Sequence, residues 1–115
     1  MSGPLREVDL KSDMPSSGDA IKRVTYNIRS GKALGVPVVK FIHGYGSTGK
    51  GGKIRVETRR YLADQKRKRL IRGFIPGEEF SIFDEATRAA FALCDDLRRD
   101  RDLDRHNNGV TFVIL

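Results

Sequence analysis

The stretch HGYGSTGKGGK, residues 43–53, gathers residue types that hold phosphate groups, directly after the apolar run VPVVKFI. Read from Gly44 it gives G-x-x-x-x-G-K, the beginning of a nucleotide-binding P-loop. The next position should be Ser or Thr, whose hydroxyl binds Mg²⁺, but it is Gly51. A chain of 115 residues is also short for a P-loop NTPase, so ATP is not expected as a cofactor.

The glycines of this stretch favour a different phosphate. They allow positive φ angles and let backbone N–H groups point toward one concavity. A helix starting near Lys53 would aim its unpaired N–H groups and its positive dipole end at the same place, and Lys50 and Arg55 add charge. The pattern predicts an anion site whose ligand is a phosphodiester. The alternative is a glycine linker without a ligand.

Three side chains beside this loop could take part in chemistry. His43 follows an expected strand, where it could transfer a proton, hydrogen-bond a phosphate oxygen or be structural. Tyr45 could stack on a base or pack against the loop. Asp9 ends another expected strand, and it could orient His43, recruit a metal-bound water or cap the turn DLKSD. If the two strands are neighbours, Asp9 and His43 lie at the same edge of the sheet.

The positive charge of the chain is concentrated in one segment. Of a net charge of +7, residues 50–72 carry ten Lys or Arg against two acidic residues, which leaves the other residues at −1. A local basic excess is typical of a nucleic-acid-binding face, although a solvated basic helix has the same composition.

Hydropathy patterns predict one α/β domain over residues 1–115, in β-α-β-α-β-α-β order. A helix over 17–33 is supported by Ser16 and Asp19 at capping-box spacing, and PVVKFIH reads as a central strand covered on both faces. The expected strands are 5–10, 37–43, 69–76 and 109–115, and the expected helices are 17–33, 53–68 and 83–103.

Composition excludes several other classes of protein. The single Cys94 leaves neither an internal disulfide nor a thiolate metal cluster, and its helical context indicates a buried thiol. No apolar run approaches the ~20 residues that span a bilayer, and the N-terminus has no apolar signal core. We therefore expect a cytoplasmic protein without membrane contact.

Three stretches together resemble the Smr (small MutS-related) domain: VDLKS, FIHGYGSTGKGGKIRVETRRYL and NGVTFVIL. The family signatures are a first-strand LD-x-H, a strand-end HG-x-G followed by a helix with a basic start, and a final G-V-T-x-V-x-L strand. The resemblance covers about residues 5–76 and 107–115. It implies a two-layer α/β sandwich with a four-stranded sheet, like the C-terminal domain of bacterial translation initiation factor three.

The resemblance also implies a function, because Smr domains bind DNA or RNA and several are nicking endonucleases. It predicts a nucleic-acid-binding domain and an endonuclease, with Mg²⁺ or Mn²⁺ as conceivable cofactors and no identified metal ligands. The alternative is a binding or adaptor module without cleavage activity. The predicted catalytic residues are Asp9, Lys11 and His43, and the predicted nucleic-acid contacts are Gly44, Tyr45, Gly46, Lys50, Lys53, Arg55, Arg59 and Arg60.

The sequence departs from the family pattern in two places. Lys11 stands where the first motif has a histidine, which favours the non-catalytic alternative. Residues 78–106 form an expected helix-bearing insertion before the last strand. This insertion could widen the binding surface or form a dimer contact through Phe80, Phe83 and Phe91, and the oligomeric state is open.

Overall fold

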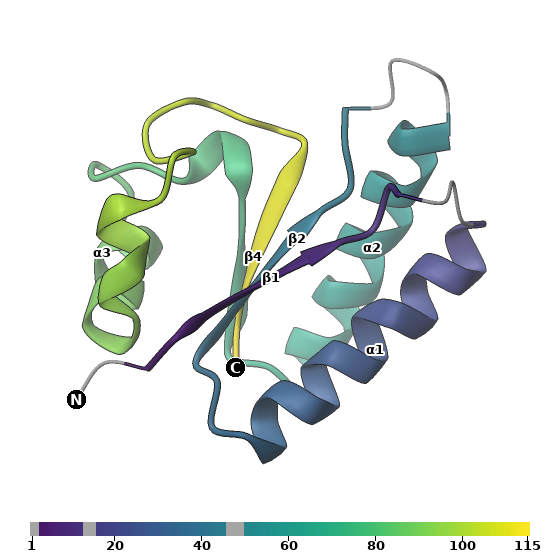
Figure 1. Cartoon of the computed structure of the whole chain (residues 1–115), viewed down its shortest axis with the longest axis horizontal. Helices are drawn as coiled ribbons and strands as arrows, with labels where there is room; N and C mark the ends of the chain where they lie inside the picture. Colours follow the sequence, from purple (N-terminus) through teal and green to yellow (C-terminus); the bar gives the residue numbers. More distant parts are fainter. Residues whose placement is uncertain (1–2, 13–15, 46–49) are drawn as a thin grey trace.

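Four strands form one mixed sheet in the order β1-β2-β4-β3 (Figure 1). β1 and β2 are parallel, whereas β4 is antiparallel to both of its neighbours, β2 and β3. The computed structural model describes residues 3–12, 16–45 and 50–115, without the side chains of residues 50 and 51. The strands are β1 (Leu5–Asp9), β2 (Val38–Ile42), β3 (Gly73–Pro76) and β4 (Val110–Ile114).

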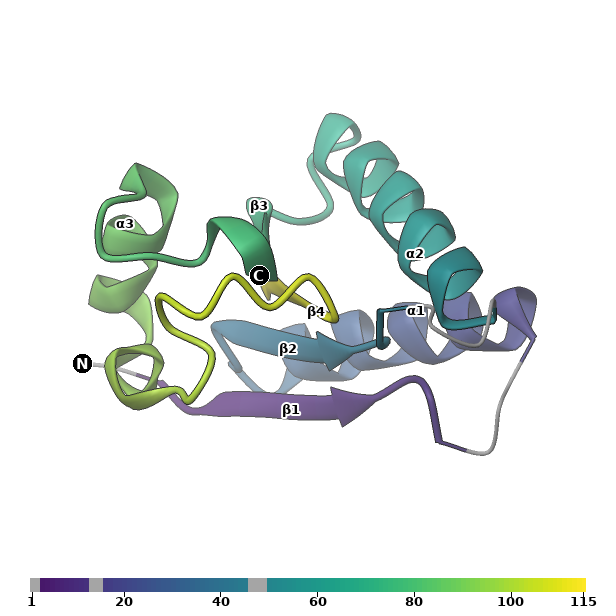
Figure 2. The same ribbon diagram turned by 90° about the horizontal axis from the view of Figure 1, so that it is seen from above.

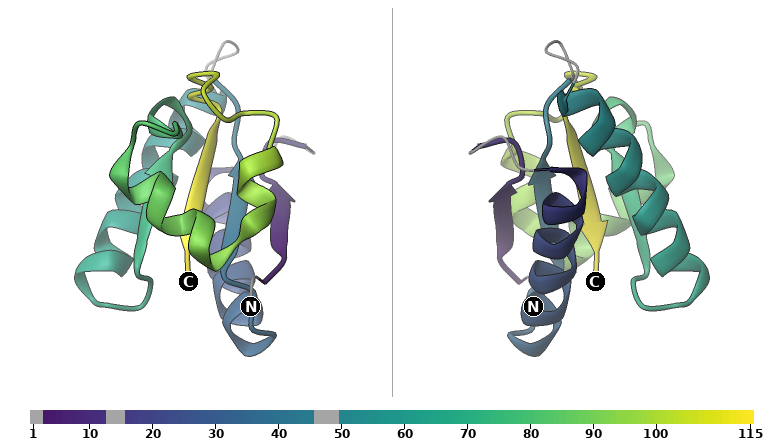
Figure 3. Two further views of the ribbon diagram at one scale, coloured as in Figure 1. Left: turned by 90° about the vertical axis from the view of Figure 1, so that its left-hand side faces the viewer. Right: turned by 90° about the vertical axis from the view of Figure 1, so that its right-hand side faces the viewer.

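Helices cover both faces of this sheet (Figures 1 and 3). The helices α1 (Ser17–Ala33) and α2 (Lys50–Arg67) pack on one face. The opposite face is covered by α3 (Glu85–Leu93) and the 3₁₀ helices η1 (Gly77–Glu79) and η2 (Asp95–Arg99). The segment predicted as an insertion, residues 78–106, thus lies on the face of the sheet opposite α1 and α2.

The alternation of side chains along β2 divides the core into two clusters. Val39 and Phe41 face α1 and α2, whereas Val38 faces α3 and the 3₁₀ helices. All three are fully buried, which confirms the predicted central strand with both faces covered. Lys40, on the same strand, is also fully buried.

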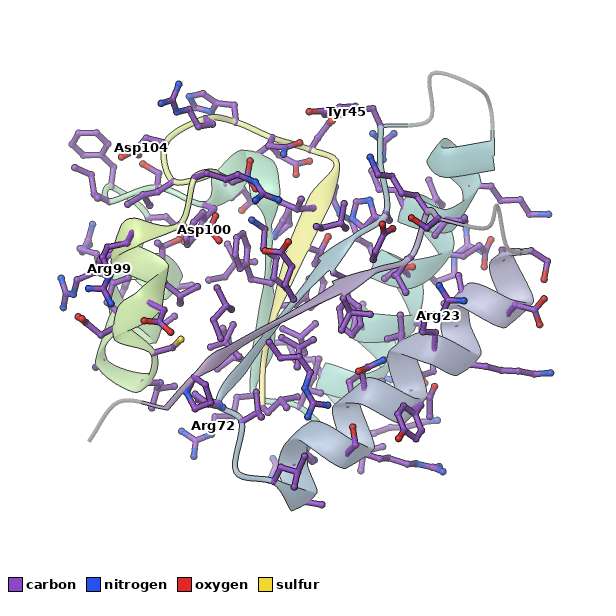
Figure 4. The ribbon with its side chains drawn as sticks, viewed as in Figure 1. Arg23, Tyr45, Arg72, Arg99, Asp100 and Asp104 are labelled. Atoms are coloured by element: carbon purple, nitrogen blue, oxygen red, sulfur yellow. The ribbon has the colours of Figure 1, made fainter. Side chains whose placement is uncertain are left out.

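Lys40 connects the insertion to the sheet. Its Nζ lies 3.0 Å from Oδ1 of Asp100, 2.6 Å from Oδ2 of Asp102 and 5.4 Å from the centre of the Phe112 ring. Figure 4 shows Asp100 above η2, on the side of the sheet that faces α3. Lys40 interrupts an otherwise apolar strand, and its ion pairs with Asp100 and Asp102 connect this segment to β2.

The α/β class and the order of the elements are confirmed, with corrected boundaries. α1 begins and ends at the expected residues, and Ser16 caps it by accepting a hydrogen bond from the backbone N–H of Asp19. α2 begins at Lys50, earlier than Lys53, so Gly51 and Gly52 lie in its first turn. The third helix ends at Leu93, where Cys94 is extended, and Asp95–Arg99 then form the separate 3₁₀ helix η2.

Two of the three phenylalanines expected at a dimer contact are in the core. Phe80 and Phe91 are 1% and 7% exposed, and both pack in the cluster beneath α3. Phe83 is 83% exposed. A dimer contact through all three rings is therefore wrong.

Within residues 3–12, 16–45 and 50–115, none of the helices combines the length and apolar character needed to cross a membrane.

Candidate functional site

The candidate site lies at the sheet edge where β1 and β2 end and β4 begins. Asp9 is in register with Ile42, and Ile42 with Val110, so the three strand ends are adjacent. Asp9 and His43 therefore lie at the same edge, as predicted for neighbouring parallel strands. The carbonyl of Gly109 accepts hydrogen bonds from the backbone N–H groups of His43 and Gly44, at 3.0 and 2.9 Å.

His43 is fully buried, and both of its ring nitrogens are hydrogen-bonded within the chain. Nδ1 lies 3.1 Å from the carbonyl oxygen of Gly44, which can only accept, so Nδ1 carries the proton. Nε2 lies 2.8 Å from the hydroxyl of Thr111, which donates to it. This assignment describes a neutral imidazole with neither nitrogen open to a ligand.

Burial lowers the pKa of His43 to about 4. The hydrogen bond to Gly44 acts in the opposite direction, and the nearby charges of Arg59 and Arg55 lower the pKa further. At neutral pH the ring is therefore uncharged, in agreement with its hydrogen bonds. In this arrangement His43 holds the strand ends together, and it could accept a proton from a ligand only after releasing Thr111.

Arg59 extends this network toward the insertion. Its Nε donates to the Thr111 hydroxyl at 3.1 Å, while Nη1 and Nη2 donate to the two carboxylate oxygens of Glu78 at 2.8 and 2.7 Å. Nη2 also lies within hydrogen-bond distance of the carbonyls of Asn108 and Val110. The guanidinium predicted to contact phosphate is thus occupied by a carboxylate from the same chain. Burial raises the pKa of Glu78, but the hydrogen bonds from Arg59 and from the backbone, together with the charges of Arg59 and Arg55, leave it below its ordinary value.

Asp9 is exposed and caps the turn that follows β1. Its carboxylate accepts hydrogen bonds from the backbone N–H groups of Lys11 and Ser12 and from the Ser12 hydroxyl. Burial raises the pKa of Asp9, but these hydrogen bonds and the charge of Lys11 leave it below its ordinary value. The turn-capping alternative therefore describes the structure. Lys11 is exposed, and its aliphatic stem approaches Gly44, with Cδ 3.6 Å from where a Cβ would lie.

At the start of the glycine loop Tyr45 is exposed and its carbonyl is bound by Arg55 of α2. Gly44 has a φ of +81°, the left-handed conformation expected of a glycine there. Tyr45 is 60% exposed, and its ring packs on Gly109, where an added Cβ would lie 3.2 Å from the ring. Lys53 is exposed on the first turns of α2, and Arg55 donates to the Tyr45 carbonyl at 3.3 Å. Both alternatives for Tyr45 therefore remain compatible with its position.

Arg60 is exposed on α2, where it pairs with Glu57. Gly46 and the Lys50 side chain are outside the described residues. The structure thus gathers Asp9, Lys11, His43, Tyr45 and Arg55 at one edge, together with Lys53.

Comparison with known proteins agrees with this architecture. No family model matches the chain, and no curated protein matches it. Among solved structures, the crystal structure of the Smr domain of Thermus thermophilus MutS2 superposes with a TM-score of 0.58, covers 96% of each chain and is 22% identical in sequence. The chain has the Smr-domain fold. At this identity the likeness establishes the fold, and the activity has to be argued from the residues.

The described part of this Smr fold does not gather a metal-binding donor set. In residues 3–12, 16–45 and 50–115, no three His, Cys, Asp or Glu side chains are grouped so that they could hold a metal ion. The carboxylate of Asp9 is directed to its own turn, and both nitrogens of His43 are occupied. These described residues therefore do not fit a bound Mg²⁺ or Mn²⁺.

Sequence reasoning missed three members of this Smr-fold site. Thr111, Glu78 and the Asn108 carbonyl complete the network around His43 and Arg59. A hydrogen bond of Thr111 was predictable, because a hydroxyl in the apolar strand GVTFVIL needs a partner when it is buried. The contact between Glu78 and Arg59 was not predictable, because the spacing of the sequence does not indicate that Glu78 lies beside α2.

Proposed function

We propose that this Smr-fold domain is a nucleic-acid-binding module whose ligand lies across the sheet edge at Tyr45 and the start of α2. The observation that carries the proposal is that an exposed aromatic ring and cations from two segments of the chain lie at one edge of the sheet. Arg55 donates to the Tyr45 carbonyl, the stem of Lys11 approaches the adjacent Gly44, and Lys53 is exposed on α2 two residues before Arg55. Cations that contact phosphates and a ring that stacks on a base are the two elements of single-strand recognition.

In this proposal His43 and Arg59 are positioning residues. Through the Thr111 hydroxyl they hold β2, β4 and α2 together beneath Tyr45. Gly109 supports the Tyr45 ring directly and accepts two backbone hydrogen bonds from the same loop. We assign the contacts to phosphate to Lys11, Lys53 and Arg55. Lys50 and Arg60 are further predicted contacts, whereas Arg59 is bound to Glu78.

Fluorescence anisotropy with a labelled single-stranded oligonucleotide over a series of salt concentrations tests this proposal. Each phosphate contact should contribute a slope of about −0.7 to the logarithm of the affinity against the logarithm of the salt concentration for a single strand. Three contacts predict a slope of about −2. Absence of binding at low salt, or binding that does not respond to salt, would contradict the proposal.

The predicted endonuclease is the second candidate function. It is favoured by the adjacency of Asp9, Lys11 and His43 at one edge of the sheet. It is opposed by the buried neutral ring of His43, whose two nitrogens are engaged. A cleavage mechanism would have to begin with release of the Thr111 hydroxyl.

Nicking of a supercoiled plasmid and cleavage of a labelled RNA, with Mg²⁺ or Mn²⁺ present, separate the two candidates. Lys11→Ala is the informative variant, because Lys11 is exposed and replacing its side chain leaves the core intact. His43→Ala, in contrast, also removes a buried hydrogen-bonded group. Cleavage by the wild type that both variants abolish would favour the endonuclease. Binding without cleavage by the wild type would favour the module.

A further inference from the structure

A groove runs over the free edge of β3, at the opposite end of the molecule from the candidate site. Its volume is about 330 Å³, and its walls include Lys66 of α2 and Ala86 and Ala89 of α3. Because α2 and α3 cover opposite faces of the sheet, a hollow lined by both must open at the β3 edge. Figure 2 shows β3 between these two helices, and Figure 4 shows Arg72 at the far end of the sheet from Tyr45.

The floor of the groove is an unpaired strand edge. In the described sheet, β3 has β4 as its one neighbour, so its second edge presents backbone groups to the groove. Gly73 has no side chain to cover this edge. The space beside it is open, because a Cβ built there would have its nearest contact, Cε of Lys66, at 4.0 Å. An extended peptide can add to such an edge through main-chain hydrogen bonds.

The wall formed by α3 is apolar. Ala86 and Ala89 are exposed, and Leu93 is half-buried beside them. Small side chains leave room for the alternate side chains of an added strand, which point toward this wall. An apolar residue at every second position of a bound peptide would fit here.

The opposite rim of the groove is strongly basic. Residues 66–72 include five Lys or Arg, and Asp64 pairs with two of them, Arg67 and Lys68. Among the described residues, Lys66, Arg69 and Arg72 have no carboxylate partner. The charge of the rim therefore complements carboxylates.

We propose that this groove binds an extended peptide of a partner protein in which apolar and acidic residues alternate. The peptide adds to β3 as a further strand, places its apolar side chains on Ala86, Ala89 and Leu93, and directs its carboxylates to Lys66 and Arg72. A nucleic-acid strand fits less well, because the α3 wall offers it no hydrogen bonds, and Phe74, an aromatic residue of the lining, is half-buried on β3. The proposal does not depend on nucleic-acid binding at Tyr45.

The test is an NMR titration of the ¹⁵N-labelled chain with a capped six-residue peptide that alternates valine and glutamate. We expect saturable amide shifts at Gly73, Phe74, Ile75 and Leu93, and none at Gly44 or Tyr45. The double variant Lys66→Glu/Arg72→Glu should weaken binding at least ten-fold. Lys22→Glu/Arg29→Glu, which makes the same charge change on exposed residues of α1, should leave it unchanged.

Four outcomes would overturn the proposal. The first is absence of shifts at millimolar peptide, and the second is equal binding by the Lys66→Glu/Arg72→Glu variant. The third is displacement of the peptide by a single-stranded oligonucleotide that shifts the same β3 amides, which would make the groove part of a nucleic-acid surface. A peptide with lysine in place of glutamate serves as the probe control, and equal shifts with it would also contradict the proposed charge recognition.

Discussion

The hydroxyl oxygen of Thr111 lies 2.8 Å from Nε2 of His43, and this contact joins the beginning of β4 to the end of β2. The same oxygen accepts a hydrogen bond from Nε of Arg59 on α2. One hydroxyl therefore connects three elements beneath the proposed binding edge. It also fixes which nitrogen of His43 carries the proton, because it donates to Nε2 while Nδ1 donates to Gly44.

Thr111→Val should destabilise the fold more than Thr111→Ser does. Valine keeps the shape of the side chain but leaves the buried Nε2 of His43 and Nε of Arg59 without their shared partner. An unsatisfied buried polar group costs about 1–3 kcal/mol, and serine retains the hydroxyl. Urea unfolding of both variants checks this expectation. Equal stability of the valine and serine variants would mean that the hydroxyl contributes nothing.

The free energy of unfolding should fall as the pH is lowered from 6.5 toward 4. The pKa of His43 is about 4 in the folded chain, against an ordinary value of 6.5. Between these values the unfolded chain binds more protons, so this contribution is fully present above pH 6.5 and is lost on acidification. Between pH 7 and pH 5 the loss should be about 2 kcal/mol.

His43→Gln isolates that contribution in urea titrations at the two pH values. The variant lacks the titrating ring, so its stability should depend less on pH than that of the wild type. His106→Gln makes the same substitution at an exposed loop histidine and is the control for the exchange of side chains. The prediction is wrong if wild type and His43→Gln lose the same free energy between pH 7 and pH 5.

Lys40→Met should loosen the insertion from the sheet. It removes the cation from between Asp100 and Asp102, whose side chains are 5% and 10% exposed. Breaking a buried ion pair on one side costs about 3–5 kcal/mol, because the remaining charge has no partner. Thermal unfolding measures the loss, and Cys94, fully buried under α3, should become reactive toward a thiol reagent.

The triple variant Lys40→Met/Asp100→Asn/Asp102→Asn is the control for this prediction. With the carboxylates neutralised, much of the lost stability should return. Continued protection of Cys94 in Lys40→Met would show that apolar packing alone holds the insertion in place.

Tyr45→Leu should weaken binding of a single-stranded oligonucleotide, whereas Tyr45→Phe should not. Stacking of a base on an aromatic ring contributes about 1–3 kcal/mol, and the phenyl ring preserves it. Tyr26→Leu is a matched control, because Tyr26 is 69% exposed on α1 and away from the sheet edge. Anisotropy titrations measure all three variants. Equal affinities of Tyr45→Leu and Tyr26→Leu would exclude a stacking role.

The sequence predicted the parts of the fold that depend on local patterns. The apolar run 38–42 and the alternation of Val8 and Leu10 follow from burial, and Ser16 caps α1 through neighbouring residues. The joint position of Asp9 and His43 was also predictable, because it requires only that two parallel strands be neighbours. These features need no knowledge of distant contacts.

The interactions of the site were less predictable because they join segments far apart in the chain. Arg59 reads as one of many cations on α2, yet its direction is set by Glu78 in the insertion. His43 reads as a residue facing a ligand, yet Thr111, 68 positions later, closes over Nε2. The burial of Lys40 likewise depends on Asp100 and Asp102, whose run RRDRDLDRHNN has the composition of a solvated loop.

The affinity of Lys53→Glu/Arg55→Glu for a single-stranded oligonucleotide at low salt tests the proposed binding edge most directly. The control is Lys22→Glu/Arg29→Glu, which has the same net charge and places the change on exposed positions of α1. We predict that the first variant loses measurable binding, while the control remains within about three-fold of the wild type, since local phosphate contacts outweigh long-range attraction. Unchanged affinity of Lys53→Glu/Arg55→Glu, or an equal loss in both variants, would contradict the account.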